Sequence, residues 1–363
     1  MATQSFDLRS KIECNPESIR FLSSAYMLSA SLFACVEIDI FTILDDEKGL
    51  TREALAHKCG FNVRQLQKLV SFCISLGLIS DEKGLLHISS AAQQMLSTKS
   101  LTNICGAARH HQRHSLPLFA SLADSLRDEE PIYDRLTIWK KPLENRDFYQ
   151  ALCEISDDLA ICLSGMNIFS RGSGSLIAQH IGDKFTFPKI LDMGGGGGQV
   201  AVEIASALPS ARITLIDLPN VVGYATQHIV QCSVDGSVTC IQGDIFDYAH
   251  HDGTLFDVVV LSSVLGDWDT EKHSQILATA YRNLKPEGLL MVSETLLDED
   301  QGGPILPTLM SLYAQVINEG GENFTENDLS ATLEGSGFVI TDVIINRFRD
   351  GRDLIAARKA RSS

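Results

Sequence analysis

The sequence is most constrained by five consecutive glycines, Gly194 to Gly198, which follow the short apolar segment KILDM. A helical pattern, QVAVEIASAL, begins directly after them at about Gln199. Because glycine has no side chain, the backbone amides of such a loop can approach a ligand closely. In open α/β sheets, ligands bind at the carboxyl ends of the strands, where such a loop lies. The loop therefore predicts a site for a dinucleotide or for S-adenosylmethionine (SAM).

The glycine spacing distinguishes a dinucleotide site from a SAM site. The dinucleotide fingerprint GxGxxG requires glycine at its sixth position. The frame that begins at Gly194 reaches Gln199 there, and the frame that begins at Gly195 reaches Val200. The acid that stands just before the loop, Asp192, points the same way, so the loop favours SAM.

Acidic residues also stand at the ends of the next two expected strands. Asp217, in LIDLPNVV, lies nineteen positions after Gly198, where a carboxylate can accept hydrogen bonds from both hydroxyls of a ribose. Asp244 follows the expected strand in VTCIQGD. There an acid can accept a hydrogen bond from the adenine amine while Ile245 packs on the ring. Together with Asp192, these acids predict the contacts of one nucleoside.

From residue 188 the sequence alternates between short β-branched apolar segments and helical segments. A parallel sheet with crossover helices has this pattern, because its strands are buried on both faces. The expected strands are residues 189–193, 211–219, 256–264 and 288–297, and the expected helices are residues 199–208 and 271–284. The pattern predicts an α/β, Rossmann-like fold for this half of the chain.

The N-terminal part has a mainly α pattern. Residues 17–45 are apolar almost all round a helical wheel, which indicates a helix buried against something large, such as a second subunit. Residues 51–89 then show two helices separated at Gly60 and a hairpin with its turn at Lys83-Gly84. Helix, turn, helix and hairpin form a winged-helix pattern, which serves either to bind DNA or to dimerise.

The charge balance favours dimerisation. The 363 residues include 30 basic and 46 acidic side chains, a net charge of −16, which repels a phosphate backbone. The second helix of the pattern carries only Arg64 and Lys68 as basic residues, so a DNA-binding regulator that senses SAM is disfavoured. We expect a homodimer through the N-terminal domain, with no nucleic-acid partner.

The composition indicates no membrane segment, disulfide framework or metal. The start, MATQSFDLRSKIECNP, lacks the basic and apolar regions of a signal peptide. No stretch approaches the roughly 18 consecutive apolar residues of a membrane span. The nine cysteines form no CxxC pair. We expect a cytoplasmic protein without a metal site.

These motifs resemble, in the same order, those of the plant caffeic-acid and animal acetylserotonin type O-methyltransferases and their bacterial natural-product relatives. The resemblance covers nearly the whole chain and rests on LDMGGGGGQV, IDLPNVV, GDIF, VLGDWDTEKHSQIL, ETLLDED and EGGENFTENDLSATLEGSGF. It implies a winged-helix dimerisation domain at residues 1–105, a helical linker and acceptor-pocket region at 106–184 and a Rossmann-like SAM-binding domain at 185–363.

The resemblance also implies SAM as methyl donor, S-adenosylhomocysteine (SAH) as product and a small, aromatic or polycyclic acceptor. The SAM contacts that it implies are Gly194, Gly196, Gly198, Asp217, Leu218, Asp244, Ile245 and Ser262, to which the position of Asp192 adds another. The acceptor contacts that it implies are Phe119, Cys153, Asp157, Trp268, Met310 and Tyr313.

The family's catalytic set is broken at one position. In members that methylate hydroxyl groups, a His before Asp-Trp removes the acceptor proton, and two Glu residues flank it. Gly266 stands in that place, before Asp267, and has no side chain to accept a proton. The first Glu is retained as Glu294. The second corresponds to Asn323, or to Glu322 if the loop differs by one residue.

Three mechanisms fit this set. The acceptor is a nitrogen or activated carbon that needs no base, so that positioning alone drives an in-line displacement. Alternatively, a hydroxyl is methylated with another base, for which a histidine-rich segment, GAARHHQRHSLPLF, supplies imidazoles. In the third, SAM is bound without transfer, and its sulfonium stabilises a polar transition state in a decarboxylation, hydroxylation or pericyclic reaction. We expect methyl transfer to N, C or O, in that order, because the cofactor contacts are intact.

The candidate catalytic residues are Glu294, Asp267, His110, His111 and His114. His110 and His114 share a helical face at i,i+4, a spacing that also suits a metal pair. No third ligand is evident, so no metal is predicted.

Overall fold

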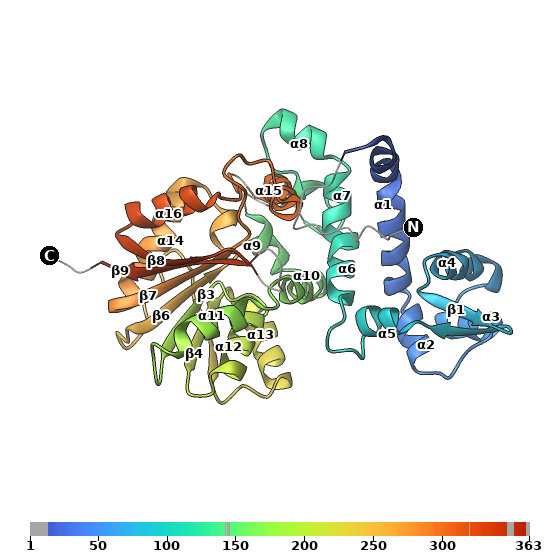
Figure 1. Cartoon of the computed structure of the whole chain (residues 1–363), viewed down its shortest axis with the longest axis horizontal. Coiled ribbons are helices and arrows are strands. Elements are labelled where there is room, and N and C mark those ends of the chain that lie inside the picture. Colours follow the sequence, from blue (N-terminus) through green and yellow to red (C-terminus); the bar gives the residue numbers. More distant parts are fainter. Residues whose placement is uncertain (1–13, 142, 144–145, 319, 347–351, 361–363) are drawn as a thin grey trace. The chain divides into compact units, whose positions relative to one another are not determined.

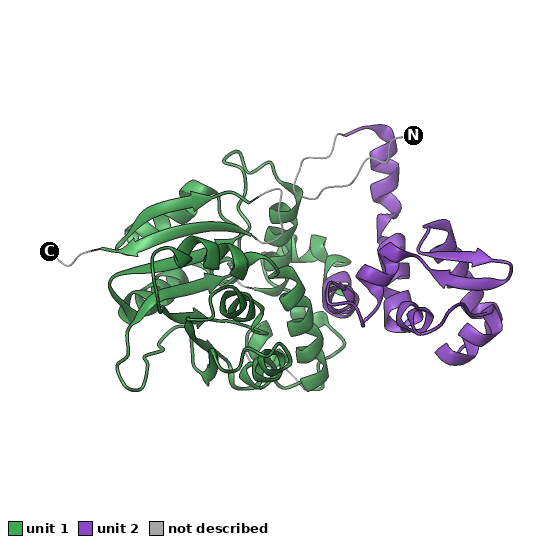
Figure 2. Cartoon of the chain, turned by 60° about the horizontal axis from the view of Figure 1, so that its bottom comes forward, with its two compact units in different colours: residues 1–12, 117–363 green, residues 13–116 purple. Residues whose placement is uncertain are grey.

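The computed structural model describes residues 14–141, 143, 146–318, 320–346 and 352–360. The chain forms two compact units, one of residues 13–116 and one of residues 1–12 and 117–363 (Figure 2). The expected three-part division at residues 105/106 and 184/185 stays a prediction.

The smaller unit is mainly helical, as expected. Its elements are α1 (Pro16–Glu37), α2 (Ile40–Asp45), α3 (Arg52–Cys59), α4 (Val63–Ser75), β1 (Ile79–Glu82), β2 (Leu85–Ile88), α5 (Ser90–Leu96), α6 (Cys105–His110) and the π-helical turn η1 (His111–Ser115). Gly60, with a φ of 72°, ends α3, and Asn62 caps α4 by accepting the Arg64 N–H. β1 and β2 pair antiparallel around Lys83-Gly84, so the helix break and the hairpin are where the sequence predicts them.

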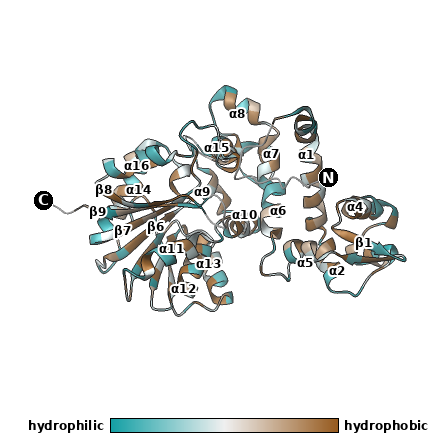
Figure 3. Cartoon of the chain, in the orientation of Figure 1, coloured by the Kyte–Doolittle hydropathy of each residue, from teal (hydrophilic) through white to brown (hydrophobic). Residues whose placement is uncertain are grey.

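The apolar segment at residues 17–45 forms two helices. Asp39, whose φ of 58° is left-handed, separates α1 from α2. Within the single chain α1 is largely uncovered, and Figure 3 shows its hydrophobic residues along the helix. Its exposed apolar side chains are Ile19, Phe21, Leu22, Tyr26, Met27 and Leu28. By length and composition alone α1 is also apolar enough to cross a membrane, although the sequence predicts no membrane segment.

The larger unit is built on a sheet whose strands are β3 (Lys189–Met193), β4 (Arg212–Asp217), β5 (Val238–Gln242), β6 (Phe256–Ser262), β7 (Leu284–Glu294), β8 (Phe338–Ile344) and β9 (Asp353–Lys359). The strand order is β5-β4-β3-β6-β7-β9-β8. Strands β5, β4, β3, β6 and β7, which are adjacent in this order, run parallel to one another. β9 is antiparallel to both β7 and β8.

Helices cover both faces of this sheet (Figure 1). Alternate strand residues face opposite sides: Ile190 and Val258 pack in one core cluster, while Leu191 and Val259 pack in the other. One cluster includes side chains of α11 (Ser173–Gly182), α12 (Gln199–Ala207) and α13 (Pro219–Gln231), and the other includes side chains of α14 (Thr270–Asn283) and α16 (Glu326–Gly335). Burial on both faces explains the continuous apolar strands of the sequence.

The antiparallel pair β8 and β9 was not expected, so the prediction of a wholly parallel sheet is incomplete. β9 is buried along Asp353–Ala357, yet its sequence, DLIAARK, has charged residues at both ends and two alanines in the middle. Neither feature is typical of a central strand. The pairing of β9 with β7 on one side and β8 on the other nevertheless makes it an inner strand of the sheet.

The remaining helices of the larger unit surround a separate core cluster that includes Phe148, Leu152 and Leu163. They are α7 (Leu116–Phe119), α8 (Leu122–Asp128), α9 (Phe148–Leu152), α10 (Ser156–Phe169) and α15 (Ile305–Ile317), with a 3-10 turn, η2 (Tyr133–Arg135). Between α8 and α9, the described residues form one regular element, η2.

Candidate functional site

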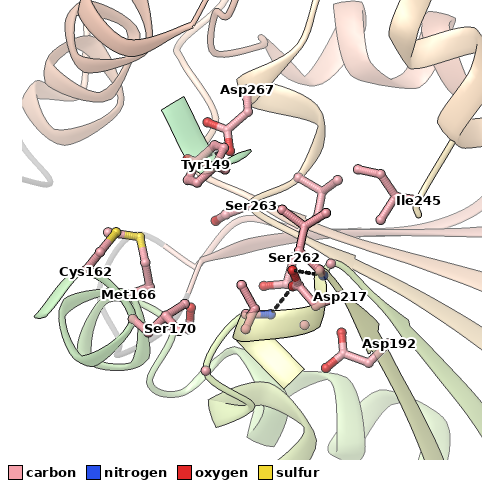
Figure 4. A pocket seen from close by; sticks show the side chains of 18 of the residues that line it. Tyr149, Cys162, Met166, Ser170, Asp192, Asp217, Ile245, Ser262, Ser263 and Asp267 are labelled. Carbon is pink, nitrogen blue, oxygen red and sulfur yellow. Dashed lines mark hydrogen bonds between the residues drawn. The ribbon is translucent and has the colours of Figure 1, made fainter. Parts of the chain in front are cut away.

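A pocket lies at the carboxyl ends of the parallel strands of the larger unit (Figure 4). It brings together most of the cofactor contacts expected from the sequence. The predicted residues that line it are Asp192, Gly194, Gly196, Asp217, Leu218, Asp244, Ile245, Ser262, Asp267 and Trp268. Gly198 lies just outside the lining and caps the start of α12.

The glycine loop is shaped by its backbone. Gly196 has a φ of 54°, a left-handed conformation that side chains rarely adopt. A Cβ on Gly197 would overlap the side chain of Asn167. The loop therefore requires glycine at both positions, and the space above it stays open for a ligand.

Asp217 ties this loop to the end of β4. Its Oδ2 accepts a hydrogen bond from the Gly196 N–H at 2.8 Å, and its Oδ1 accepts one from the Leu218 N–H at 2.7 Å. Burial raises the pKa of the Asp217 carboxyl to about 6, although both amides favour the ionised form. The carboxylate thus lies fixed in the wall of the pocket.

Polar atoms in the pocket retain unused hydrogen-bonding capacity. Asp192 is buried, and burial together with the charge of Asp217 raises its pKa to about 7. Among the described residues, neither Asp192 Oδ2 nor the Oγ of Ser262 has a hydrogen-bond partner. Buried polar atoms are rarely left without partners. A polar ligand such as SAM, whose amine and hydroxyl groups donate hydrogen bonds, would satisfy them.

The charge of the pocket also suits SAM, which carries a cationic sulfonium. Its lining includes several aspartates and one arginine, Arg352. Asp244 is exposed at the rim and accepts a hydrogen bond from the Phe246 N–H at 2.9 Å. The side chain of Ile245 lies 3.6 Å from the position of a Cβ on Gly194, so the loop and this apolar side chain face the same space.

Asp267 lies in the same pocket beside Tyr149 (Figure 4). The Tyr149 hydroxyl donates to Asp267 Oδ2 at 2.8 Å, and Asn318 Nδ2 donates to Oδ1 at 3.0 Å. Burial raises the pKa of Asp267 to about 7 in spite of these two donors. A carboxyl with a pKa near neutral can exchange a proton at physiological pH.

Glu294 ends β7 and faces the turn that holds Gly266. Its Oε1 accepts hydrogen bonds from the backbone N–H groups of Val264 at 3.0 Å and Leu265 at 3.1 Å. Burial raises the pKa of Glu294 to about 7, while the charge of Arg352 opposes that rise.

A side chain at position 266 would meet no obstacle at its Cβ. That atom would lie 3.6 Å from Asn323 Oδ1, 3.8 Å from Glu294 Oε2 and 3.5 Å from the backbone oxygen of Glu322. These are ordinary contact distances, and the φ of Gly266 is not left-handed. The Glu322 side chain is exposed, so the geometry favours Asn323 over Glu322 as the second flanking residue. Backbone conformation does not explain the glycine.

The other acceptor contacts implied by the resemblance lie outside the lining of this pocket. The rings of Phe119 and Tyr313 stack at 6.4 Å with an interplanar angle of 14°. Cys153 accepts a hydrogen bond from Asn220 through its backbone oxygen at 2.5 Å. Asp157 is exposed on α10, and Met310 is half-buried on α15. Their roles as acceptor contacts stay predictions.

The three candidate histidines belong to the smaller unit. The Nδ1 atoms of His110 and His114 are 3.0 Å apart, and His111 Nδ1 is 3.2 Å from Ser115 Oγ. Burial lowers the pKa of His110 well below its ordinary value and also lowers that of His111, which makes both weak bases. Among the described residues, His250, His251 and Asp252 form the one cluster with metal-ligand spacing, within 4.8 Å of one another and largely exposed.

Several lining residues had no signal in the sequence. Tyr149, Ser170 and Arg352 stand outside every motif. The structure brings them to the pocket from α9, from just after α10 and from just before β9. Asn167, which contacts the glycine loop, stands three residues before Ser170 on the same helix. Only tertiary contacts over more than a hundred residues place Tyr149 beside Asp267.

Comparison with known families matches two models to the chain. The O-methyltransferase domain matches residues 164–339, and the O-methyltransferase dimerisation domain matches residues 21–98.

Individual relatives match almost end to end. Human acetylserotonin O-methyltransferase is 30% identical over 331 residues, which cover 87% of this chain and 90% of the relative. The 3-hydroxy-5-methyl-1-naphthoate 3-O-methyltransferase of Streptomyces sahachiroi is 25% identical over 322 residues, 89% of each chain.

Solved structures also match this chain over nearly its whole length. The crystal structure of human N-acetylserotonin methyltransferase in complex with SAM has a TM-score of 0.84, with 28% identity over 97% of this chain and 99% of that one. The structure of PigF with SAH has a TM-score of 0.81 at 22% identity, over 95% and 100% of the two chains.

Proposed function

Since the chain belongs to the SAM-dependent O-methyltransferase family of the acetylserotonin type, we propose that it methylates a small aromatic or polycyclic secondary metabolite without the family's histidine base. SAM supplies the methyl group and leaves as SAH. In this proposal Asp217 binds the ribose hydroxyls, Asp244 and Ile245 bind the adenine, and Asp192 and Ser262 complete the cofactor site. Trp268 packs beside the acceptor.

One observation carries the proposal: position 266 has room for a Cβ atom and carries no side chain. A Cβ there would lie at ordinary distances from Glu294 and Asn323, the two positions that flank the base in hydroxyl-methylating members. One of these two residues, Asn323, has an uncharged amide side chain. An acceptor nitrogen or activated carbon already carries the electron pair that attacks the methyl group, so orientation is sufficient.

A hydroxyl acceptor is the second candidate, and Asp267 is the observation that favours it. The carboxyl lines the pocket, and its pKa of about 7 suits a general base. Tyr149 and Asn318 hold its two oxygens in place. Named relatives that methylate hydroxyl groups, such as the naphthoate 3-O-methyltransferase, are consistent with this assignment.

A paired set of acceptors separates these candidates. The chain is incubated with methyl-labelled SAM and either 1-naphthylamine or 1-naphthol, which differ only in the nucleophilic atom, with 1,3-dihydroxynaphthalene as a carbon nucleophile. The proposal expects N-methylated amine or C-methylated dihydroxynaphthalene in excess of any O-methylated product, with one SAH for each methyl transferred. Turnover of an acceptor without SAH would instead favour a non-methylating reaction of the decarboxylase or pericyclase kind.

We also propose that the chain acts as a cytoplasmic homodimer through its N-terminal unit. The dimerisation domain includes most of α1, whose exposed apolar side chains a second subunit would cover. This position favours a subunit interface over a membrane span for the same helix. The winged-helix assignment and the absence of nucleic-acid partners stay predictions of the sequence.

A further inference from the structure

Arg352 places a guanidinium in the wall of the pocket, immediately before β9. Its side chain is half-buried, and its Nη1 donates to Ser170 Oγ at 3.3 Å. Its backbone N–H donates to Ser173 Oγ at 3.3 Å. The residue is thereby anchored between β9 and the end of α10.

Two carboxyl groups lie near this guanidinium without pairing with it. The charges of Glu294 and Asp267 raise the pKa of Arg352, against the larger lowering effect of burial. In the part of the chain that the structure describes, however, no carboxylate oxygen lies within 4.0 Å of the Arg352 guanidinium, the limit for an ion pair. By contrast, Arg135 at the surface forms an ion pair with Asp124 at 2.7 Å.

The two carboxyl groups take their hydrogen bonds from neutral donors instead. Glu294 accepts from two backbone N–H groups, and Asp267 accepts from a phenol and an amide. A guanidinium has five N–H donors, and the described residues give this one a single long hydrogen bond. An anion that pairs with such a partly buried cation and accepts its remaining N–H groups would stabilise it.

We propose that Arg352 is a carboxylate-binding residue of this pocket. The inference rests on the proposed assignment of the pocket to SAM and the acceptor. A carboxylate is the planar anion that matches the two-pronged geometry of a guanidinium. It has two possible sources here, the methionyl end of SAM or a carboxylate on the methyl acceptor, and both require the same chemistry of Arg352.

Isothermal titration with paired ligands distinguishes the sources. SAH carries the methionyl carboxylate, and 5′-methylthioadenosine keeps the adenosine and sulfur without it. For the acceptor, 1-naphthoate and 1-naphthamide are titrated into protein saturated with SAH. The variants are Arg352→Gln, Arg352→Lys, which keeps the charge, and the control Arg358→Gln, which changes an exposed arginine of the same strand.

If SAM is the source, Arg352→Gln weakens SAH binding by about 10- to 100-fold and leaves methylthioadenosine unchanged. If the acceptor is the source, Arg352→Gln abolishes a preference of the wild type for naphthoate over naphthamide. Either result supports the inference, with an intermediate loss in Arg352→Lys and none in Arg358→Gln.

The inference is overturned if Arg352→Gln binds SAH as the wild type does and the wild type shows no preference for naphthoate. It is also overturned if SAH and methylthioadenosine weaken equally, because the variant then disturbs the pocket generally. Melting temperatures of both Arg352 variants show whether the fold is retained. A wild-type chain that binds neither SAH nor methylthioadenosine contradicts the proposed cofactor site itself.

Discussion

Asp217 Oδ2 accepts a hydrogen bond from the Gly196 backbone N–H at 2.8 Å, which joins the end of β4 to the glycine loop that follows β3. The carboxylate proposed to bind the ribose therefore also fixes the loop beneath the cofactor. Cofactor binding and the shape of the glycine loop therefore both depend on the Asp217 side chain.

Asp217→Asn should weaken SAH binding by about 10- to 100-fold, because an amide replaces one acceptor oxygen by a donor and removes the charge. Isothermal titration calorimetry measures the change. Asp235→Asn, the same substitution at an exposed position, serves as the control and should bind as the wild type does. Equal affinity of Asp217→Asn and wild type would remove Asp217 from the site.

Asp192 should make the ligand-free protein less stable at alkaline pH. Its pKa in the folded chain, about 7, lies above the ordinary value of an unfolded aspartate. The stability that the protonated Asp192 carboxyl contributes is therefore complete below the unfolded pKa and is lost as pH rises through about 7. Asp192→Asn does not titrate, so its loss of melting temperature between pH 5.5 and pH 8 should be about 2–5 °C smaller than that of the wild type. Identical slopes would show that the carboxyl is not desolvated.

Gly266→His should fold normally and fail to accelerate the native reaction. The Cβ has room, so the melting temperature should stay within about 2 °C of wild type, and SAH affinity should not change. Because the proposed acceptor brings its own electron pair, an added imidazole has no proton to remove. Rates with the best acceptor of the paired set measure this. A large gain would mean that the native acceptor is a hydroxyl that lacks its base.

His110→Gln, His111→Gln and His114→Gln, made singly, should leave the pH dependence of kcat/KM unchanged. His110 and His114 interact with each other, and burial depresses the pKa of His110, which suits a structural role. Asp267→Asn, assayed beside them, tests the alternative base. Loss of the acidic limb in any histidine variant would restore that imidazole as a base candidate.

Leu22→Glu combined with Tyr26→Glu should convert the dimer to a monomer. The two side chains are 56% and 61% exposed on one stretch of α1, and buried charge at an apolar interface is strongly unfavourable. Light scattering after size-exclusion chromatography measures the mass. Phe187→Glu, which changes an exposed residue of the other unit, should leave the dimer intact. A dimer in both variants would place the interface elsewhere.

The local features of this fold could be predicted from the sequence. The glycine loop, the acids at the ends of β3 and β4 and the β1–β2 turn each depend on neighbours within a few residues. Tyr149, Arg352 and the order of β9 in the sheet could not, because each depends on contacts between segments far apart in the chain. The missing base at Gly266 was predictable only because the resemblance implies a histidine at that position.

The place of β9 also has a consequence for biosynthesis. Because residues 353–359 are hydrogen-bonded on one side to β7 and on the other to β8, the sheet cannot be completed on the ribosome until this segment has emerged. Until then β7 and β8 each present an unpaired edge, and the guanidinium at position 352 is missing from the pocket. Productive folding of the larger unit therefore requires residues 353–359 to pair with two strands that precede them in the chain.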